Sequence, residues 1–485
     1  MNYQNLKNKI TGKVHFIGLG GIGMSALALI LNKIGVAVQG SDLNENYLTQ
    51  TLRDKGITYF VGHDAKNITD DIKLIVETSI IKTNNQEILA AQEKNIPIIT
   101  RAQLLAMVMA ERKGVTIAGT HGKTSTTAMT SLMLEIAGLD PTVINGGIIN
   151  YFKSNSKIGE GEYLVAESDE SDGSFVNLPT FIGAVTNIEP EHLESYNHDF
   201  EKQKEYFEKY ITQIAANGLC VLCIDDEEIE KIYNKIKNQH TNLVTYSIKK
   251  PADLTARNIK ADIHGISFDV EFNYSAQFSK NHLQQLPQKV LKNLHLPAYG
   301  MHNVSNALVA IAIADFLHIS AENIAKALAS FSGVKRRFSK VGEANGVVII
   351  DDYGHHPTEI KATLEAARQL VGKHKIISVL QPHKYTRVRD LFAEFCHCAD
   401  EADVVIVSDI YSAGQQPIEG ITQDSLISGI KKAGHKNVIK LNDEKDLAAL
   451  VKANSQAGDI VLCTGAGTST YWAGKLPEQL KNLEN

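Results

Sequence analysis

The stretch "KVHFIGLGGIGMSALALILNKIGVAVQGSD", residues 13–42, contains a short apolar run, four clustered glycines, a longer apolar run and a polar end. This order predicts a strand over 14–17, a glycine turn, a helix over 24–33 and a second strand over 36–39. Ser41 and Asp42 follow that second strand. Glycine backbone lets N–H groups approach an anion at a helix N-terminus. The stretch therefore predicts a phosphate-binding βαβ unit at the start of a parallel sheet.

Other interpretations of this stretch are a secretory signal, a membrane span or a different nucleotide site. The apolar periodicity continues past Ala28 to Ile34, beyond the point where a signal region should end, and a membrane span has no need of clustered glycines. We therefore expect neither a leader nor an anchor here. Asp42 lies where a ribose-binding acid would sit, which leaves an NAD-dependent oxidoreductase open. A Rossmann-like turn that binds no nucleotide is a further alternative.

Composition limits the class of protein. A chain of 485 residues suggests about three domains. The net charge of -6 gives no electrostatic reason to expect nucleic acid or an acidic membrane surface. Five cysteines suggest no disulfide framework, and the pair Cys220 and Cys223 lies in an apolar run that predicts a strand with buried thiols. A reducing cytoplasm fits these features.

A second glycine loop lies in "VTIAGTHGKTSTTAMTSLMLEIAGLD", residues 115–140. The pattern predicts a strand over 115–118, a loop, and a helix from Ser125 that ends at Gly138. The loop is two residues shorter than the GxxxxGK[ST] motif, but it keeps Lys123 for the terminal phosphates and Thr124 for Mg²⁺. The sequence therefore predicts an ATP-binding phosphate loop.

Acidic residues follow the next predicted strands. The strand over 163–166 ends in Glu167, which is followed by Asp169, Glu170 and Asp172, and the strand over 183–187 ends near His192. Glu167 is the preferred magnesium ligand, and His192 is equally compatible with a structural role. Two phosphate loops do not fit a simple dehydrogenase or a simple kinase. They fit an enzyme that holds one nucleotide as a substrate handle and hydrolyses another.

Strands and helices alternate on both sides of this central segment. Before it, strands are expected over 57–60, 74–77 and 97–100 with a helix over 102–112, and the charged run 111–114 is a candidate hinge. After it, strands are expected over 347–350, 375–380, 404–408 and 459–463, with helices over 357–370 and 388–396. We predict domains over 1–112, 113–332 and 333–485. His355 and His356 follow a strand and are expected to contact substrate rather than metal.

Motifs along almost the whole chain resemble those of the Mur ligase family of peptidoglycan synthesis. Residues 228–295 carry no such motif. The matching stretches are "HFIGLGGIGMSALA", "GSDL", "AGTHGKTSTT", "LVAESDESDGSF", "TNIEPEHLESY", "GMHNVSNALVA", "GVKRRF", "IDDYGHHPTEI", "QPHKYTRVRDL" and "TGAG". The resemblance implies an α/β chain of three domains: an N-terminal Rossmann-like domain that binds UDP, a central P-loop ATPase-like parallel sheet that binds ATP, and a C-terminal Rossmann-like, doubly wound ligase domain.

The resemblance also assigns roles to residues. The UDP part of the substrate is expected at Gly18, Gly20, Gly21, Gly23, Met24, Ser41 and Asp42. ATP is expected at Gly119, Thr120, His121, Gly122, Lys123, Thr124, Ser125, His302, Asn303, Asn306, Arg337 (or Arg336) and Asp352 (or Asp351). The magnesium ligands are expected to be Thr124, Glu167 and His192. The amino acid and the muramoyl carboxylate are expected to meet at Tyr353, His355, His383 and Arg387. The expected catalytic residues are Lys123, His192, His355, His383 and Arg387.

Two positions depart from or distinguish the family pattern. Glu191 stands where the family usually has Asp before the magnesium histidine. Phe207 aligns with the carbamylated lysine of several sister ligases, so Lys204 is not nominated.

The implied reaction is ATP-dependent amide formation between L-alanine and UDP-N-acetylmuramate through an acyl phosphate, with ATP and Mg²⁺ as cofactors. A ligase that attaches a ready-made tripeptide is the nearest alternative, and the GxGGxGM loop favours the alanine-adding branch. A non-enzymatic nucleotide-sensing protein is a more distant one. We expect a cytoplasmic monomer or weak homodimer without nucleic-acid partner or membrane insertion. The choice among alanine, glycine and serine and the base for the amine stay open.

Overall fold

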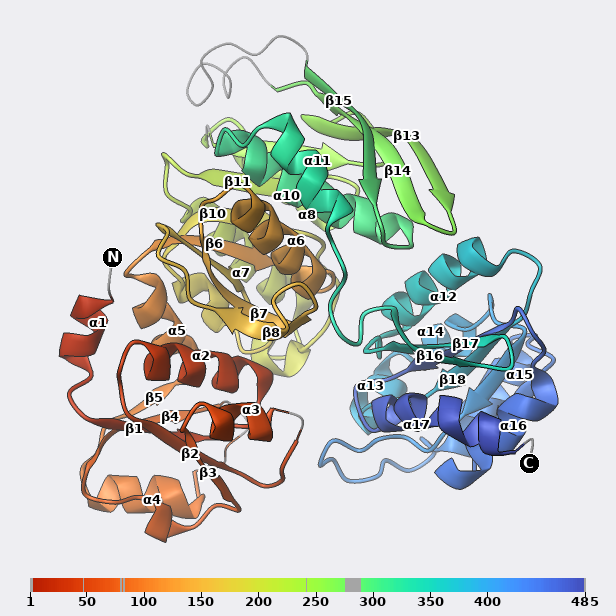
Figure 1. Cartoon of the computed structure of the whole chain (residues 1–485), viewed down its shortest axis with the longest axis horizontal. Helices are drawn as coiled ribbons and strands as arrows, with labels where there is room; N and C mark the ends of the chain where they lie inside the picture. The colour runs from red at the N-terminus through yellow and green to blue at the C-terminus, as the bar shows by residue number, and fades with distance from the viewer. Residues whose placement is uncertain are drawn as a thin grey trace. The chain divides into compact units, whose positions relative to one another are not determined.

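The computed structural model describes residues 3–46, 48–78, 81, 83–240, 242–274 and 289–483 (Figure 1). The chain forms two compact units. The first contains the described residues up to Ile259 together with 268–274, 289–296 and 305–332, and the second contains 260–267, 297–304 and 333–483.

The N-terminal part of the first unit is a five-stranded sheet in which every pair of neighbours is parallel. The strand order is β3-β2-β1-β4-β5, so the order reverses beside β1, where open α/β sheets bind their ligands. The strands are β1 (Lys13–Ile17), β2 (Val38–Asp42), β3 (Thr58–Val61), β4 (Ile72–Glu77) and β5 (Ile98–Thr100). The helices are α1 (Gln4–Lys9), α2 (Ile22–Lys33), α3 (Thr49–Asp54), η1 (Ala65–Asn67), α4 (Gln86–Glu93) and α5 (Arg101–Met109).

A ten-stranded sheet forms the central part, in the order β15-β14-β13-β12-β11-β10-β6-β9-β7-β8. Neighbours from β13 to β7 are parallel, whereas β8 is antiparallel to β7. The strands are β6 (Lys113–Ala118), β7 (Thr142–Ile149), β8 (Ser154–Lys157), β9 (Tyr163–Glu167), β10 (Thr180–Val185), β11 (Leu219–Cys223), β12 (Leu243–Ser247), β13 (Leu254–Asp262), β14 (Gly265–Phe272) and β15 (Lys289–Leu296). The helices are α6 (Lys123–Ile136), η2 (Ser174–Asn177), η3 (Leu193–Tyr196), α7 (Phe200–Thr212), α8 (Glu227–Ile236), α10 (Met301–Phe316) and α11 (Ala321–Ala329).

The second unit contains a six-stranded sheet in the order β16-β17-β21-β18-β19-β20. Only its edge strand β16 is antiparallel to its neighbour. The strands are β16 (Ser339–Ala344), β17 (Val347–Asp352), β18 (Ile376–Leu380), β19 (Val404–Val407), β20 (Val438–Lys440) and β21 (Ile460–Thr464). The helices are α12 (Pro357–Val371), α13 (Tyr385–Asp390), α14 (Phe392–His397), α15 (Gln423–Lys432), η4 (Glu444–Asp446), α16 (Leu447–Asn454) and α17 (Ser469–Asn482).

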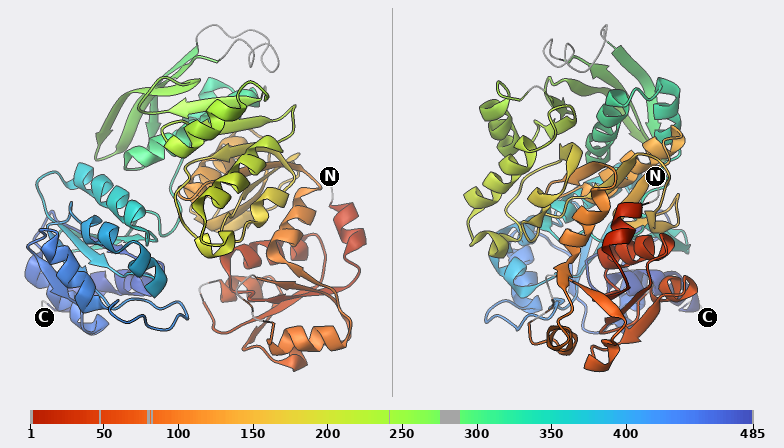
Figure 2. Two further views of the ribbon diagram at one scale, coloured as in Figure 1. Left: turned by 180° about the vertical axis from the view of Figure 1, so that it is seen from behind. Right: turned by 90° about the vertical axis from the view of Figure 1, so that its left-hand side faces the viewer.

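Helices cover both faces of this last sheet, as Figure 2 shows from two further directions. Two separate apolar cores result, because successive residues of each strand point to opposite faces. Helices α12, α14 and α15 pack into one core, and α16 and α17 pack into the other. The predicted α/β fold of three domains with a doubly wound third domain is therefore confirmed.

Some local predictions were wrong. The charged run 111–114 is not a hinge throughout, because Lys113 and Gly114 begin β6. β2 begins two residues later than predicted and includes Ser41 and Asp42. The helix predicted over 388–396 is split into α13 and α14 around Leu391. The thiols of Cys220 and Cys223 are buried as expected. Among the described residues, no helix is long and apolar enough to cross a membrane.

Candidate active site

The first glycine loop connects β1 to α2 at the carboxyl edge of the N-terminal sheet. Gly18 adopts φ +91°, and a Cβ there would lie 2.7 Å from the methyl carbon of Thr78. The amide of Gly21, the N-cap of α2, donates to the carbonyl of Gly18 at 3.1 Å. α2 begins two residues earlier than predicted, so Gly23 lies in its first turn. The loop thus places bare backbone at a helix N-terminus, as an anion site requires.

The end of β2 braces this loop. The carbonyl of Ser41 accepts from the amides of Gly18 and Leu19 at 2.8 and 2.9 Å. A carboxylate oxygen of Asp42 accepts from the amide of Gly20 at 2.9 Å. The acid predicted to bind ribose therefore also determines the shape of the loop.

The second glycine loop connects β6 to α6, and two of its glycines leave no room for a side chain. Gly119 adopts φ +125°, and a Cβ there would lie 2.2 Å from the hydroxyl oxygen of Thr186. Gly122, the N-cap of α6, adopts φ +83°, and its Cβ would lie 2.7 Å from the side-chain oxygen of Asn306. The helix begins at Lys123 rather than at the predicted Ser125.

Acceptors enclose the ammonium group of Lys123. Its Nζ donates to the carbonyls of Gly119 at 2.6 Å and Thr120 at 3.0 Å, and lies 2.7 Å from a carboxylate oxygen of Glu170. Burial lowers the pKa of Lys123, but the charges of Glu170 and Asp169 outweigh it and raise that pKa above its ordinary value. Burial raises the pKa of Glu170 to about 7, against the attraction of Lys123. Lys123 is therefore a permanent positive charge within the loop.

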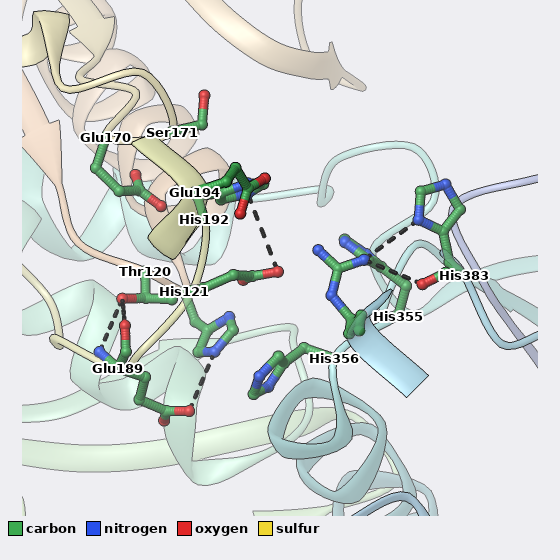
Figure 3. Close-up of polar contacts among 12 residues, drawn as sticks. Thr120, His121, Glu170, Ser171, Glu189, His192, Glu194, His355, His356 and His383 are labelled. Carbon is green, nitrogen blue, oxygen red and sulfur yellow. Dashed lines mark hydrogen bonds and ion pairs between the residues drawn. The ribbon is translucent and has the colours of Figure 1, made fainter. Parts of the chain in front are cut away.

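Residues that follow β10 hold the second loop from the neighbouring strand. The hydroxyl oxygen of Thr120 accepts from the amide of Glu189 at 2.9 Å, and the amide of His121 donates to the side-chain oxygen of Asn187 at 2.7 Å. Nε2 of His121 lies 3.4 Å from the carboxylate of Glu189 (Figure 3). Thr120 with its side chain and His121 with its backbone amide thus fix the shape of the loop that is predicted to bind ATP.

The three predicted magnesium ligands lie at the end of β9 (Glu167) and in the segments that follow the neighbouring strands β6 (Thr124) and β10 (His192). Glu167 ends β9 and accepts from the amide of Gly146 at 2.6 Å, and Thr124 is buried in the first turn of α6. His192 adopts φ +56°, and its Nδ1 lies 3.8 Å from the carboxylate of Glu194. Mg²⁺ prefers oxygen ligands, so the hydroxyl of Thr124 and the carboxylate of Glu167 fit this ion better than the imidazole of His192 does.

In the second unit, Tyr353, His355, His383 and Arg387 lie together after β17 and β18, as predicted. The rings of His355 and Tyr353 are 5.2 Å apart, and those of His355 and His383 are 5.3 Å apart. The guanidinium of Arg387 donates to Nδ1 of His383 at 3.2 Å (Figure 3). Because arginine only donates, a neutral His383 carries its proton on Nε2. Its ring also stacks on Tyr411, 5.5 Å away with 12° between the planes.

Asp352 fixes backbone at the end of β17. Its buried carboxylate accepts from the amides of Phe338 and Gly354, each at 2.7 Å. Burial raises the pKa of Asp352, although the positive charge of Arg337 acts in the opposite direction. The guanidinium of Arg337 lies 5.3 Å from the ring centroid of Tyr353. Asp352 therefore positions the segment that carries Arg337.

The start of α10 carries the three residues predicted to lie near adenine. The side-chain amide of Asn303 donates to the carbonyl of Tyr299 at 2.7 Å and lies 3.1 Å from Nε2 of His302. Asn306, one turn further along, is the residue that closely approaches Gly122 of the second loop.

Three contacts were not expected from the sequence. Two acids of the run after β9 have different partners: Glu170 pairs with Lys123, and Asp169 pairs with Arg101 at 2.9 Å. Tyr411 supports His383 from a loop that carries no recognised motif. No signal in the sequence identifies these partners, because each pair is joined only by the fold.

Models of the Mur ligase family match three successive parts of the chain. The Mur ligase catalytic domain matches residues 13–113, the Mur ligase middle domain residues 117–314, and the Mur ligase glutamate ligase domain residues 336–467. The chain belongs to the Mur ligase family. The resemblance drawn from the motifs is therefore confirmed.

Individual proteins that are similar to this Mur ligase are themselves ligases of the same family. A UDP-N-acetylmuramate–L-alanine ligase of Agrobacterium fabrum is 46% identical over 98% of both chains. One of Rhodospirillum centenum is 44% identical over 97% of this chain and 95% of its own. The solved UDP-N-acetylmuramate–alanine ligase of Thermotoga maritima is 29% identical, with a TM-score of 0.80 over 97% of this chain and all of that one. A murein peptide ligase of Psychrobacter arcticus, 22% identical with a TM-score of 0.70, shares the fold.

Proposed function

We propose that this Mur ligase joins L-alanine to the carboxylate of UDP-N-acetylmuramate, with conversion of ATP to ADP and phosphate. The observation that carries the proposal is the second glycine loop, in which Lys123 is enclosed by two loop carbonyls and Glu170. The names of relatives that are 44–46% identical over nearly their whole length support this choice of substrates.

The chemistry follows from the bond to be made. A carboxylate oxygen is a poor leaving group, so transfer of the γ-phosphoryl group of ATP to that oxygen first gives an acyl phosphate and ADP. The neutral amine of alanine then attacks the carbonyl carbon, phosphate leaves, and the amine loses a proton as the amide forms. The protein contributes mainly by positioning the reactants and by neutralising charge on the phosphoryl oxygens.

Lys123 is the fixed positive charge for the phosphoryl oxygens, and the backbone N–H groups of the loop cradle the phosphates. Thr124 and Glu167, with His192 as a further candidate, would hold Mg²⁺, which supplies additional positive charge at the phosphates when bound. Arg387 and His383 are the donors proposed for the substrate carboxylate and the developing oxyanion. The guanidinium of Arg387 is planar and always charged, and neutral His383 donates through Nε2. His355 and Tyr353 line the same cluster.

The first loop is the proposed handle for UDP. The backbone N–H groups of the first turn of α2, which begins at Ile22 directly after the loop, are offered to the diphosphate, and Ser41 and Asp42 are placed for the nucleoside. We further propose that the reaction takes place in the cytoplasm. All five cysteines are free and buried, which is compatible with a reducing compartment.

One assay tests the proposal. Phosphate release from ATP is followed with UDP-N-acetylmuramate and, in separate reactions, L-alanine, glycine, L-serine and the tripeptide. We expect release that depends on both the UDP-sugar and L-alanine. Release with the tripeptide but not with alanine would identify the recycling ligase instead. ATP binding without amino-acid-dependent release would exclude a ligase, and saturable NAD binding would favour the oxidoreductase.

A further inference from the structure

A buried polar cluster lies next to the first loop, and the mechanism above does not use its central residue. That residue is Glu87, in the first turn of α4, whose side chain is fully buried. The other members come from β1, β2 and the segment after β3. They are His15, Gln39, Ser41, His63 and Asn67.

Glu87 is a carboxylate that accepts hydrogen bonds from three side chains and has a fourth, that of His15, at ion-pair distance. Its Oε2 lies 2.5 Å from the hydroxyl of Ser41, 3.2 Å from Nδ1 of His63 and 3.4 Å from Nε2 of His15. Its Oε1 accepts from the side-chain amide of Asn67 at 2.7 Å. Burial raises the pKa of Glu87, but the interactions with His15, Ser41 and Asn67 outweigh it and lower that pKa below its usual value. An ionised carboxylate can only accept.

The hydrogen bonds assign the proton of His15. The side-chain amide of Gln39 lies 3.1 Å from Nδ1 of His15 and donates to the carbonyl of Asn67 at 2.8 Å. An amide nitrogen only donates, so Nδ1 of His15 is the acceptor and the proton is on Nε2, facing Glu87.

The same reasoning assigns His63. The single proton of Ser41 goes to Glu87, which leaves the oxygen of Ser41 as an acceptor 2.9 Å from Nδ1 of His63. Both neighbours of that nitrogen accept, so Nδ1 carries the proton and Nε2 of the neutral ring is an acceptor. Among the described residues, none makes a hydrogen bond to Nε2, and the side chain of His63 keeps 13% of its exposure.

His63 lies at the edge where the first loop lies. It follows β3 directly, and the preceding Gly62 donates its amide to the carbonyl of Asp42 at 2.7 Å. Ser41, which contacts the ring of His63, also accepts from the amide of Gly18. The oriented ring, the end of β2 and the glycine loop are therefore parts of one hydrogen-bonded edge.

We propose that Glu87 is a positioning residue of the nucleotide-sugar site. It holds His63 with the proton on Nδ1, so that Nε2 accepts a hydrogen bond from a donor group of the bound uridine, either the N3–H of the base or a ribose hydroxyl. This inference rests on the proposed role of the first loop as the UDP site. It explains why a carboxylate with three hydrogen-bond donors and the ring of His15 around it is buried under that loop, where removal from water would otherwise disfavour the charged form.

The first test reads the tautomer directly. In the full-length protein labelled with ¹⁵N at the histidine rings, NMR should show His63 with Nδ1 protonated and Nε2 bare, the signal being assigned by its loss in His63→Asn. In Glu87→Gln we expect this preference to weaken or reverse. Protonation of Nε2 alone in the wild type, or an unchanged ring in Glu87→Gln, would overturn the proposal.

The second test separates positioning from stability. Glu87→Gln should raise the KM for UDP-N-acetylmuramate about tenfold, the effect of one lost hydrogen bond, with kcat within about twofold. His63→Asn keeps a donor near the position of Nδ1 but lacks Nε2, so it should raise KM equally. Glu93→Gln, an exposed position on the same helix, is the matched control and should change nothing. A fall in melting temperature or kcat with KM unchanged would assign the cluster a structural role only.

The third test identifies the donor on the ligand. Competition for the site by UDP, 2′-deoxy-UDP and N3-methyl-UDP is compared in the wild type and His63→Asn. The analogue that lacks the donor should bind more weakly than UDP to the wild type but as well as UDP to the variant. Equal losses in both proteins for both analogues would overturn the contact. If wild-type protein shows these effects without alanine-dependent phosphate release, the proposed reaction fails while the role of Glu87 stands.

Discussion

The two glycine loops have the same plan and different chemistry. Each follows a buried parallel strand, contains glycine at positive φ (Gly18 in the first loop, Gly119 and Gly122 in the second) and leads into a helix N-terminus. The first loop is braced by the carboxylate of Asp42 and leads into the N–H groups of the first turn of α2, whereas the second encloses the ammonium of Lys123. In the proposed reaction, backbone alone holds a diphosphate that does not react. A phosphoryl group that is transferred needs a fixed charge as well.

The largest effect is expected at the charge that distinguishes the loops. Lys123→Ala should lower alanine-dependent ADP release at least about 100-fold, as loss of a strong charge-stabilising donor does. Calorimetry should show unchanged affinity for UDP-N-acetylmuramate, since the first loop is intact. Lys123→Arg, which keeps the charge in a different shape, serves as the comparison. Near-normal turnover by Lys123→Ala would remove the distinction between the loops.

The next effect concerns the close backbone approach in the second loop. Gly119→Ala should lower kcat/KM for ATP about 10- to 100-fold, because it adds strain at positive φ and a clash with Thr186. Gly138→Ala is the matched control, since Gly138 also has positive φ (+78°) but would place its Cβ in open space. Equal kinetics for the two variants would show that the clash is harmless.

A smaller effect is expected in the first loop. Asp42→Ala removes the acceptor for the amide of Gly20 and should raise the KM for UDP-N-acetylmuramate about tenfold. The KM for ATP should stay within about twofold, in contrast to Gly119→Ala. Asp42→Asn keeps an acceptor oxygen and should recover most of the affinity. Steady-state kinetics with each substrate varied in turn would detect a loss shared by both substrates, which would contradict separate roles for the loops.

The smallest effect is a pH dependence of stability from the second loop. The pKa of Glu170 is about 7 in the folded protein, above its ordinary value of 4.5. The folded state thus holds this proton more tightly, and the associated stability is lost as the pH rises from about 4.5 through 7. The Glu170→Gln variant has no carboxyl group at this position and therefore cannot titrate there. Calorimetry should show the wild-type midpoint falling relative to the variant by about 1–4 °C between pH 5 and 8.

Glu205→Gln, an exposed position on α7, is the control for that experiment and should follow the wild type at every pH. A difference between wild type and Glu170→Gln that stays flat or increases with pH would contradict the assignment. The first loop has no corresponding buried pair of lysine and carboxylate among its described contacts. Variants of that loop should therefore show no such loss of stability relative to the wild type between pH 5 and 8.

Much of the fold follows from local spacing. The apolar run before Gly18 and the one before Gly119 were each recognised as strands because a buried parallel strand is short and uninterrupted. Tyr353, His355, His383 and Arg387 were expected at strand ends and are found together there. Residues 228–295 gave no motif, although α8 has isoleucines at helical spacing that an analysis of periodicity can detect.

The contacts between distant residues did not follow from the sequence. Glu170 was grouped with the metal candidates because it stands in an acidic run, yet it pairs with Lys123. The pairing depends on β9 lying beside β6, and strand order is a property of the whole sheet. No local pattern of the sequence marks the cluster around Glu87, since its members are single polar residues spread over residues 15–87.

The three alternating βα segments, the two glycine loops and the membership of the family can all be predicted from the sequence. These features are encoded between near neighbours, through side-chain periodicity and the conformational freedom of glycine. The partner of each carboxylate is known only from the fold: Asp42 accepts from the amide of Gly20, Glu170 pairs with Lys123, and Glu87 accepts from His63. Such pairs depend on which strands adjoin and which way each side chain points. Burial then makes the choice of partner matter, because a buried charge without one is strongly disfavoured.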